Sequence, residues 1–251
     1  MGKIIAIANQ KGGVGMTTTC VNLTAALTER GKKVLLIDFD PQGNSTSGMG
    51  VSKRSAPSAH DVITGAAEAA DAVMPLPWGN LLPANSDLAG AEVELVNSPR
   101  REYRLRDALE SIRDDYDYIF IDCPPSLGTL TLNGLTAADS LLVPLQCEYY
   151  AMEGVADLTT SVKLANRRVN RNLYIEGILL TMYDKRLSFS AQVADELRGY
   201  FGDRVYETVI PRNVRLAEAP SHGRPVTAYD GSSKGAKAYR AAAAEFLERQ
   251  G

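Results

Sequence analysis

The fold of this chain is decided by the stretch Lys11-Gly12-Gly13-Val14-Gly15-Met16-Thr17-Thr18. An apolar run at residues 4–8 precedes it and predicts a strand, and a helical pattern at residues 18–30 follows it. A glycine-rich turn between a strand and a helix start is the setting of a phosphate-binding loop. Its glycines can adopt positive φ, so the N–H groups and the positive end of the helix dipole can converge on one anion. Thr17 adds a hydroxyl suited to Mg²⁺.

One residue departs from this pattern. A phosphate-binding loop ends in Gly-Lys-Thr, whereas this chain has Gly15-Met16-Thr17. Two other interpretations compete: an ordinary tight turn that contains glycines, and a dinucleotide-binding turn. The second requires G-x-G-x-x-G, which the glycine spacing here does not give. The glycines, the preceding strand and Thr17 together favour phosphate binding.

Composition limits the classes of protein to consider. The 251 residues, 45% of them hydrophobic, suit one large α/β domain or two small ones. No apolar run reaches the roughly 20 residues that span a membrane, and the first strand does not read as a signal peptide. The net charge of −3 means that nucleic-acid binding would need a local basic patch. Cys20, Cys123 and Cys147 lack metal-site spacing, and His60 and His222 are the only histidines.

Two further predicted strands end in carboxylates. The apolar run at residues 33–38 is continuous, which is typical of a strand buried on both faces, and leads into Asp38-Phe39-Asp40-Pro41-Gln42-Gly43-Asn44. The run at residues 118–122 ends in Asp122, as in a Walker B strand whose carboxylate holds Mg²⁺ directly or through water. Either segment alone also fits a plain polar strand end. Together with the loop at residues 11–18 they predict a ligand site at the carboxyl edge of a parallel sheet.

The rest of the chain alternates strands with helices. We expect strands at residues 80–84, 140–145, 175–182 and 205–210, helices at residues 103–116, 152–169, 190–201 and 234–248, and short helices and loops at residues 52–80. The basic run at residues 167–171 fits a solvated helix end, where cations favour the helix dipole. The alternation predicts a single α/β domain over residues 1–251, with a mostly parallel twisted sheet and helices on both faces, similar to P-loop NTPases.

Three segments resemble the ParA/MinD family of ATPases. Residues 11–18 resemble the family's deviant Walker A box, whose mark is a lysine at the start of the loop, here with Met16 in place of the P-loop lysine. Residues 38–44 resemble its A′ box. Residues 210–225 look like the segment that faces the nucleotide base and DNA in the chromosomal, Soj-like ParA branch. The resemblance extends from Lys3 to about Tyr239.

The resemblance implies roles for the matching residues. Lys11 would reach across an ATP-sandwich dimer to the partner's phosphates, and Asp40 would position or activate the attacking water. Thr17 would bind Mg²⁺ with Asp122 behind it. The residues implied to bind ATP or ADP are Lys11, Gly12, Gly13, Val14, Gly15, Met16, Thr17, Thr18, Pro211, Arg212 and Asn213, the last three against the adenine.

The implied function is ATP-dependent partitioning of chromosomes or plasmids. Family members dimerise around ATP, bind double-stranded DNA without sequence preference, and are released from it by a ParB-type centromere-binding protein. Their DNA contacts fall here on Lys185, Arg186 and Arg215. Such a protein would be cytoplasmic and nucleoid-associated, with no membrane partner. Met16 predicts an ATPase whose hydrolysis is impaired.

Four alternatives stay open. A MinD-like membrane-cycling regulator would need an amphipathic C-terminal anchor, and residues 241–248 are Ala-rich and acidic. The same ATPase could position a cargo other than DNA. A nitrogenase-type electron carrier needs cluster-ligating cysteines, whose pattern Cys123 and Cys147 do not match. Met16 also allows a nucleotide-responsive binding protein without turnover.

Overall fold

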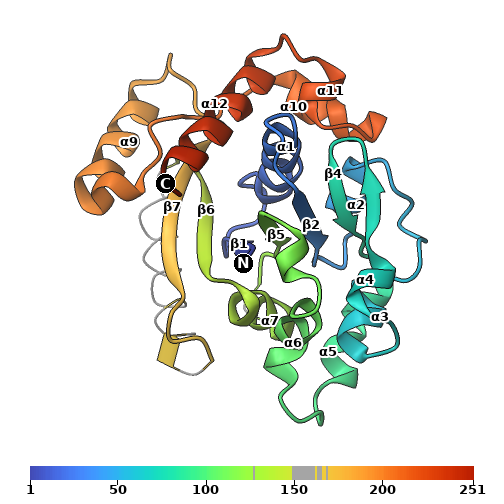
Figure 1. Cartoon of the computed structure of the whole chain (residues 1–251). Coiled ribbons are helices and arrows are strands. Elements are labelled where there is room, and N and C mark those ends of the chain that lie inside the picture. Colours follow the sequence, from blue (N-terminus) through green and yellow to red (C-terminus); the bar gives the residue numbers. More distant parts are fainter. Residues whose placement is uncertain (127, 149–161, 163–165, 168) are drawn as a thin grey trace.

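The computed structural model describes all residues except 127, 149–161, 163–165 and 168 (Figure 1). Its centre is a seven-stranded sheet in the order β3-β4-β2-β5-β1-β6-β7. All neighbouring strands are parallel except the β3–β4 hairpin. The strands are β1 (Lys3–Ile7), β2 (Val34–Asp38), β3 (Met74–Leu76), β4 (Gly79–Leu82), β5 (Tyr118–Asp122), β6 (Ser140–Gln146) and β7 (Tyr174–Thr181). This confirms the predicted α/β class and the mostly parallel sheet.

The central strands are those whose apolar runs are continuous. β5 lies between β1 and β2, and all five residues of β2 are buried. The register sets Asp122 beside both Ile7 and Asp38. Parallel strands in register end at the same edge, so β1, β2 and β5 bring the loop after β1 and two carboxylates to one place.

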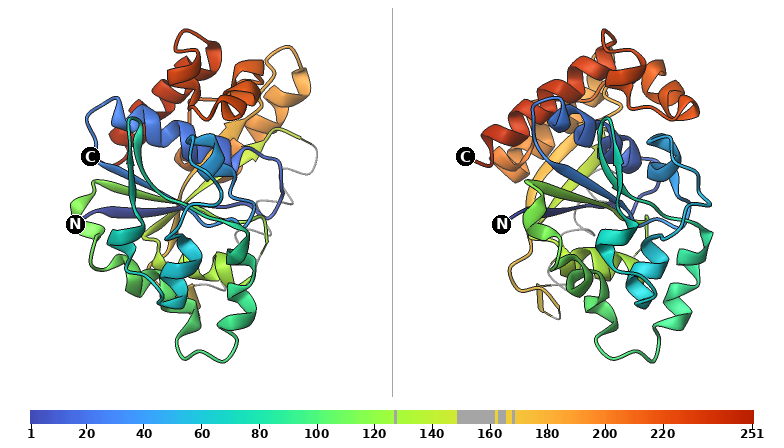
Figure 2. Two further views of the ribbon diagram at one scale, coloured as in Figure 1. Left: turned by 90° about the vertical axis from the view of Figure 1, so that its right-hand side faces the viewer. Right: turned by 45° about the vertical axis from the view of Figure 1, so that its right-hand side comes forward.

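Helices cover both faces of the sheet, as Figure 2 shows in two views. One face carries α1 and α12, the other α3 to α7, and each face has its own buried apolar cluster. Because α1 packs against both the sheet and α12, it is buried along most of its length. The α-helices are α1 (Met16–Thr28), α2 (Asn44–Gly48), α3 (Ala59–Thr64), α4 (Ala69–Ala72), α5 (Ala91–Glu94), α6 (Arg104–Leu109), α7 (Thr129–Ala137), α9 (Ser188–Phe201), α10 (Val214–Glu218), α11 (Val226–Tyr229) and α12 (Lys234–Glu248). The 3₁₀ turns are η1 (Ser86–Ala89), η2 (Arg101–Tyr103), η3 (Arg113–Asp115), η4 (Gly202–Arg204) and η5 (Ala219–His222).

The strand predicted at residues 205–210 is wrong. This segment runs beside β7 and makes isolated parallel bridges only at Val205 and Pro211. Between them, the Glu245 carboxylate of α12 accepts hydrogen bonds of 2.8 Å from the backbone N–H groups of Glu207 and Thr208. The N–H groups of Tyr206 and Ile210 still donate to the carbonyl oxygens of Ile178 and Leu180 on β7, so Glu207 and Thr208 bulge out between them towards Glu245 and interrupt the ladder.

Other predictions differ in extent. The helix predicted at residues 103–116 is shorter: α6 ends at Leu109, with 3₁₀ turns on both sides. The pattern missed the antiparallel strand β3 and the helix α7. The predicted helix at residues 152–169, and Arg168 of the basic run, lie largely outside the described residues. The final helix, by contrast, has the predicted bounds.

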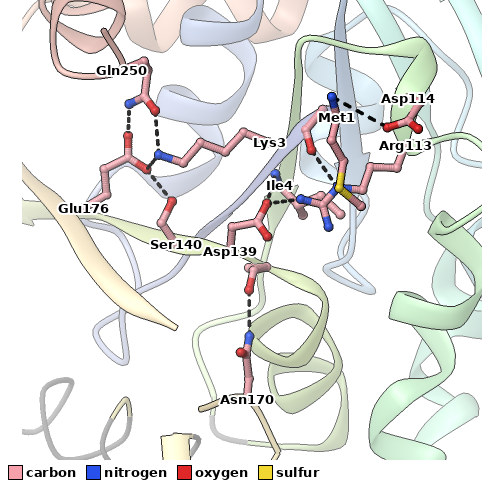
Figure 3. Close-up of polar contacts among 12 residues, drawn as sticks. Met1, Lys3, Ile4, Arg113, Asp114, Asp139, Ser140, Asn170, Glu176 and Gln250 are labelled. Carbon is pink, nitrogen blue, oxygen red and sulfur yellow. Dashed lines mark hydrogen bonds and ion pairs between the residues drawn. The ribbon is translucent and has the colours of Figure 1, made fainter. Parts of the chain in front are cut away.

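Side chains join the amino ends of the strands to one another at the opposite edge of the sheet (Figure 3). Arg113 donates to Asp139 at 2.6 Å and to the carbonyl oxygen of Gly2 at 2.7 Å. Lys3 pairs with the buried Glu176 at 3.1 Å and also donates to Gln250, next to the last residue. This edge is held by satisfied polar groups, whereas the predicted ligand residues lie at the carboxyl edge.

Candidate nucleotide-binding site

The glycine-rich loop joins β1 to α1, as its sequence predicts. Gly13 and Gly15 have φ values of 77° and 89°, in the left-handed region that favours glycine, whereas Gly12 does not adopt a positive φ. Gly15 is the N-cap of α1. Because glycine has no side chain to cap the helix, the first N–H groups of α1 are left without a capping side chain and face the loop. The loop and the helix start thus form a concave set of backbone donors suited to an anion.

Contacts from distant strands hold this loop in place. The Asn9 side chain donates to the carbonyl oxygen of Pro144 at 2.8 Å and accepts from the backbone N–H of Lys11 at 3.0 Å. The Thr181 hydroxyl, at the end of β7, donates to the carbonyl oxygen of Val14 at 2.6 Å. Buried hydrogen bonds of this kind fix a backbone that would otherwise be free to rearrange.

Asp38 and Asp122 face each other as neighbours at the ends of β2 and β5. Each fixes one of two consecutive residues of α2: Asp38 accepts from the N–H and the hydroxyl of Thr46, both at 2.6 Å, and Asp122 accepts from the Ser45 hydroxyl at 2.7 Å. Burial raises the pKa of Asp38 to about 7, and the Asp122 charge adds to the rise. Burial also raises the pKa of Asp122 to about 6, against hydrogen bonds from Ser45, Thr17 and Cys20.

Thr17 and Asp122 form a pair of oxygen donors beside the loop. The Thr17 hydroxyl lies close enough to the Asp122 carboxylate to lower its pKa. The described residues contain no cluster of three His, Cys, Asp or Glu side chains that could hold a metal by themselves. One hydroxyl and one carboxylate fit Mg²⁺, which keeps several waters and takes further oxygens from phosphates. Thr17 and Asp122 are therefore residues that could hold this ion.

Asp40 lies at the turn after β2 and is half-buried. Its carboxylate accepts from the N–H of Gln42 at 2.9 Å, and its own N–H approaches Asp38 at 3.3 Å. The turn closes with a hydrogen bond of 2.8 Å from the N–H of Gly43 to the carbonyl oxygen of Asp40. Asp38 thus supports the backbone on which Asp40 sits, a role that no sequence motif indicated.

Lys11 pairs with a carboxylate outside the loop. Its ammonium contacts the Glu148 carboxylate at 2.5 Å, and the two side chains are 43% and 44% exposed. Half exposure leaves the lysine able to exchange this partner for another at modest cost. The pairing joins residues far apart in the sequence, and nothing in the loop's pattern points to Glu148.

A cavity of about 260 Å³ opens beside the loop. It brings together the predicted Pro211, Arg212 and Asn213 with Gly15 and Thr18 of the loop and helix start. It is also lined by residues that the sequence did not single out: Thr181, Met182, Ile210, Leu216, Ala217 and Tyr239. The mostly apolar lining next to backbone donors suits a flat ring joined to an anionic chain.

Met16 opens α1 and is 8% exposed, as part of the apolar cluster under α1 and α12. Its side chain therefore contributes to the core and offers no charge to the anion site. The backbone donors of the loop, Thr17 and the carboxylates lie near one another, and residue 16 supplies no cation beside them.

The predicted DNA-contacting residues do not form one cluster. Arg186 is held in the loop after β7 by Asp184 at 2.6 Å. Arg215 lies on α10 and pairs with Glu218 at 2.7 Å and with Asp230 at 3.2 Å. Lys185 is exposed and lines a groove together with Arg186, and that groove does not include Arg215. No helix of the described residues is long and apolar enough to cross a membrane.

Known proteins are similar to this chain over nearly its whole length. Residues 2–175 match the family described as an AAA domain. The chain is 55% identical, over 242 residues, to the sporulation initiation inhibitor protein Soj of Bacillus subtilis, covering 95% of this chain and 96% of that protein. It is 51% identical to the chromosome partitioning protein ParA of Myxococcus xanthus, covering 99% of this chain and 89% of that protein.

Solved structures share the whole architecture. A Mycobacterium smegmatis protein named cobyrinic acid a,c-diamide synthase, with ADP and magnesium bound, has a TM-score of 0.87 and 42% identity, covering 100% of this chain and 96% of that chain. The Pyrococcus furiosus cell division ATPase MinD has a TM-score of 0.81 and 28% identity, covering 99% of each chain.

Proposed function

Because the chain belongs to the ParA/MinD family of P-loop ATPases, among its Soj and ParA members, we propose that it is a DNA-partitioning ATPase that dimerises around ATP. Over residues 1–251, acting as one domain, it would bind DNA without sequence preference and be released by a ParB-type partner. The cavity beside the glycine-rich loop carries this proposal, since it unites Gly15 and Thr18, the neighbours of Met16 and Thr17, with residues 210–213. The chain is 55% identical to Soj and 42% identical to the Mycobacterium protein named as a synthase, and this difference favours partitioning.

In the proposed site the chain binds ATP or ADP with Mg²⁺. Pro211, Arg212 and Asn213 would lie against the adenine, and the N–H groups of the loop would hold the phosphates. Thr17 and Asp122 would hold Mg²⁺, which supplies charge neutralisation on the phosphate oxygens. The ADP and magnesium of the similar Mycobacterium structure support this assignment.

Hydrolysis needs a positioned water and positive charge more than covalent chemistry. Asp40 would accept a hydrogen bond from the attacking water, on a turn fixed by Asp38. Lys11 would reach the phosphates of the other protomer, and for that it must leave Glu148. Bound nucleotide would then be part of the dimer interface, so nucleotide state would control dimerisation.

DNA binding would use exposed cations that dimerisation brings together from two protomers. Lys185, Arg186 and Arg215 are the candidates, and Arg186 and Arg215 would exchange their carboxylate partners for phosphates. A protein with this cycle would act in the cytoplasm on the nucleoid.

Met16 favours a second candidate function. A chain that keeps the loop, Asp40 and the cavity of about 260 Å³ beside the loop, which we call the base cavity, but lacks the P-loop cation would bind nucleotide weakly and turn it over slowly or not at all. It would act as a nucleotide-responsive DNA or cargo binder.

One experiment separates the two candidates. ATP and ADP are titrated calorimetrically with Mg²⁺, and ATP hydrolysis is measured with and without duplex DNA, for the parent chain and for Met16→Lys. DNA-stimulated hydrolysis by the parent, raised further in Met16→Lys, supports the partitioning ATPase with an impaired parent, whereas nucleotide binding by the parent with turnover only in Met16→Lys supports the binder without turnover. Loss of nucleotide binding in both proteins would refute the site.

A further inference from the structure

A second hollow, of about 510 Å³, lies next to the base cavity. We call it the basic groove. It is formed by the loop after β7, the irregular segment before α10 and the start of α12. Its lining residues are Tyr183, Asp184, Lys185, Arg186, Val209, Pro211, Arg212, Lys234 and Ala238.

Positive charge dominates the rim of the basic groove. Four of its lining residues are cations and one is an acid. The acid, Asp184, is paired with Arg186, whose guanidinium donates a hydrogen bond to each carboxylate oxygen. Lys185, Arg212 and Lys234 form no salt bridge with any described carboxylate. The Arg212 charge also acts on Asp184, so Lys185 and Lys234 are the lining cations without a described carboxylate partner, and the groove has four positive charges against one negative charge.

The rest of the lining is apolar and half-buried. Tyr183, Val209 and Ala238 belong to the margins of the two core clusters and leave part of their surface open to the groove. A duplex presents phosphates on a convex surface and gains nothing from a concave apolar floor. A peptide gains from both parts, with an apolar side chain on the floor and carboxylates on the rim.

We propose that the basic groove binds a short acidic segment of a protein partner, anchored by one apolar side chain between α12 and the loop after β7. This inference goes beyond the proposed function, since it requires neither ATP hydrolysis nor DNA.

The groove is coupled to the base cavity by shared residues. Pro211 and Arg212 line both. Backbone hydrogen bonds connect the two sides: the N–H of Tyr183 donates to Ile210 at 2.9 Å, and the N–H of Arg212 donates to Tyr183 at 3.2 Å. A base that moves residues 210–212 changes the groove, so nucleotide and peptide affect each other's affinity reciprocally.

If Lys185 and Arg186 also bind DNA, as proposed above, the acidic segment and DNA compete for them. This consequence rests on the proposed function. Its control is Arg215→Ala, because Arg215 does not line the groove: this variant should weaken DNA binding without changing peptide binding.

The test is selection from a displayed random peptide library on the purified full chain, followed by fluorescence anisotropy with the strongest peptide. We expect selected sequences to carry Asp or Glu around one large apolar residue. Lys234→Gln should weaken peptide binding several-fold. Lys234→Glu should weaken it by about tenfold or more, because it replaces an attractive charge on the rim by a repulsive one. Ala238→Leu, which fills the floor, should also weaken it.

Lys237→Glu is the matched control, an exposed lysine on the same helix that does not line the groove. It should leave binding within about twofold. Replacing a lysine in the first turn of α12 removes an unfavourable interaction with the positive end of the helix dipole, so the Lys234 variants should fold. Their melting temperatures check this.

Selected peptides without acidic bias would overturn the proposal, as would peptide binding that is unchanged in Lys234→Glu and Ala238→Leu. A third result would also overturn it: Ala238→Leu lowers the affinity for duplex DNA but not for any selected peptide. The groove would then be a DNA-binding site.

Discussion

Replacing Met16 by lysine should change stability in opposite directions with and without nucleotide. Met16 is 8% exposed and packs in the apolar cluster under α1 and α12. Without nucleotide, a lysine here must bury its ammonium or extend it out of the core. Burying a polar group without a partner costs about 1–3 kcal/mol, and a charge costs more.

Nucleotide reverses the sign of the effect. With phosphates on the loop, the ammonium gains a charge-assisted contact worth about 1.5–3 kcal/mol. ATP affinity should therefore rise roughly ten- to a hundredfold. The transition state carries more charge on the transferred group, and one preorganised donor is worth about 10²–10³ in rate. Hydrolysis should increase more than binding does.

Thermal unfolding with and without Mg²⁺-ATP, together with a phosphate-release assay, measures both effects. In a chain of this length about 1 kcal/mol shifts the melting temperature by roughly 2–4 °C. We expect Met16→Lys to melt below the parent without nucleotide, and to gain more than the parent when ATP is added. Met16→Leu is the control, because it keeps the core volume and adds no charge.

Two results would refute this reasoning. One is robust, DNA-stimulated hydrolysis by the parent chain, which would mean that Lys11 or another cation already replaces the missing charge. The other is an equal ATP-induced shift in Met16→Lys and Met16→Leu, which would mean that residue 16 does not reach the phosphates.

Three further predictions concern the carboxylates and the DNA surface. In a Met16→Lys background, Asp40→Ala should leave ATP-dependent dimers that bind DNA without turnover, whereas Asp122→Ala should weaken Mg²⁺-nucleotide binding itself; parent-rate hydrolysis by Asp40→Ala excludes its role on the water. Arg186→Ala should weaken binding to duplexes of any sequence and lower the log–log salt slope by about one, and an unchanged slope in fluorescence titrations contradicts the assignment. Burial holds the pKa of Asp38 near 7, above an unfolded value of about 3.9, so the unfolded chain loses this proton first and the free energy of unfolding falls as pH rises between those values. Urea unfolding at pH 5 and pH 8 should therefore show a smaller pH dependence in Asp38→Asn, and an equal dependence contradicts it.

The sequence predicted those features that depend on neighbouring residues. The glycine-rich loop, the continuous apolar runs of β1, β2 and β5, and the carboxylates that end two of them were all readable, because backbone preference and two-sided burial leave a local pattern. The resemblance carried by the same residues gave the family. Where patterning failed, as at residues 205–210, a single side chain from α12 intervened, and no local pattern encodes Glu245.

The tertiary structure decided how these local pieces meet. The base cavity takes its walls from the loop, the end of β7, residues 210–217 and Tyr239, which only the strand order and the path of α12 bring together. The partners of Lys11 and Arg215 and the support of Asp40 by Asp38 were equally invisible beforehand. The sequence by itself determined which groups stand at the ends of which strands. Contacts between distant segments, which depend on how the sheet is ordered and covered, determined which of those groups touch.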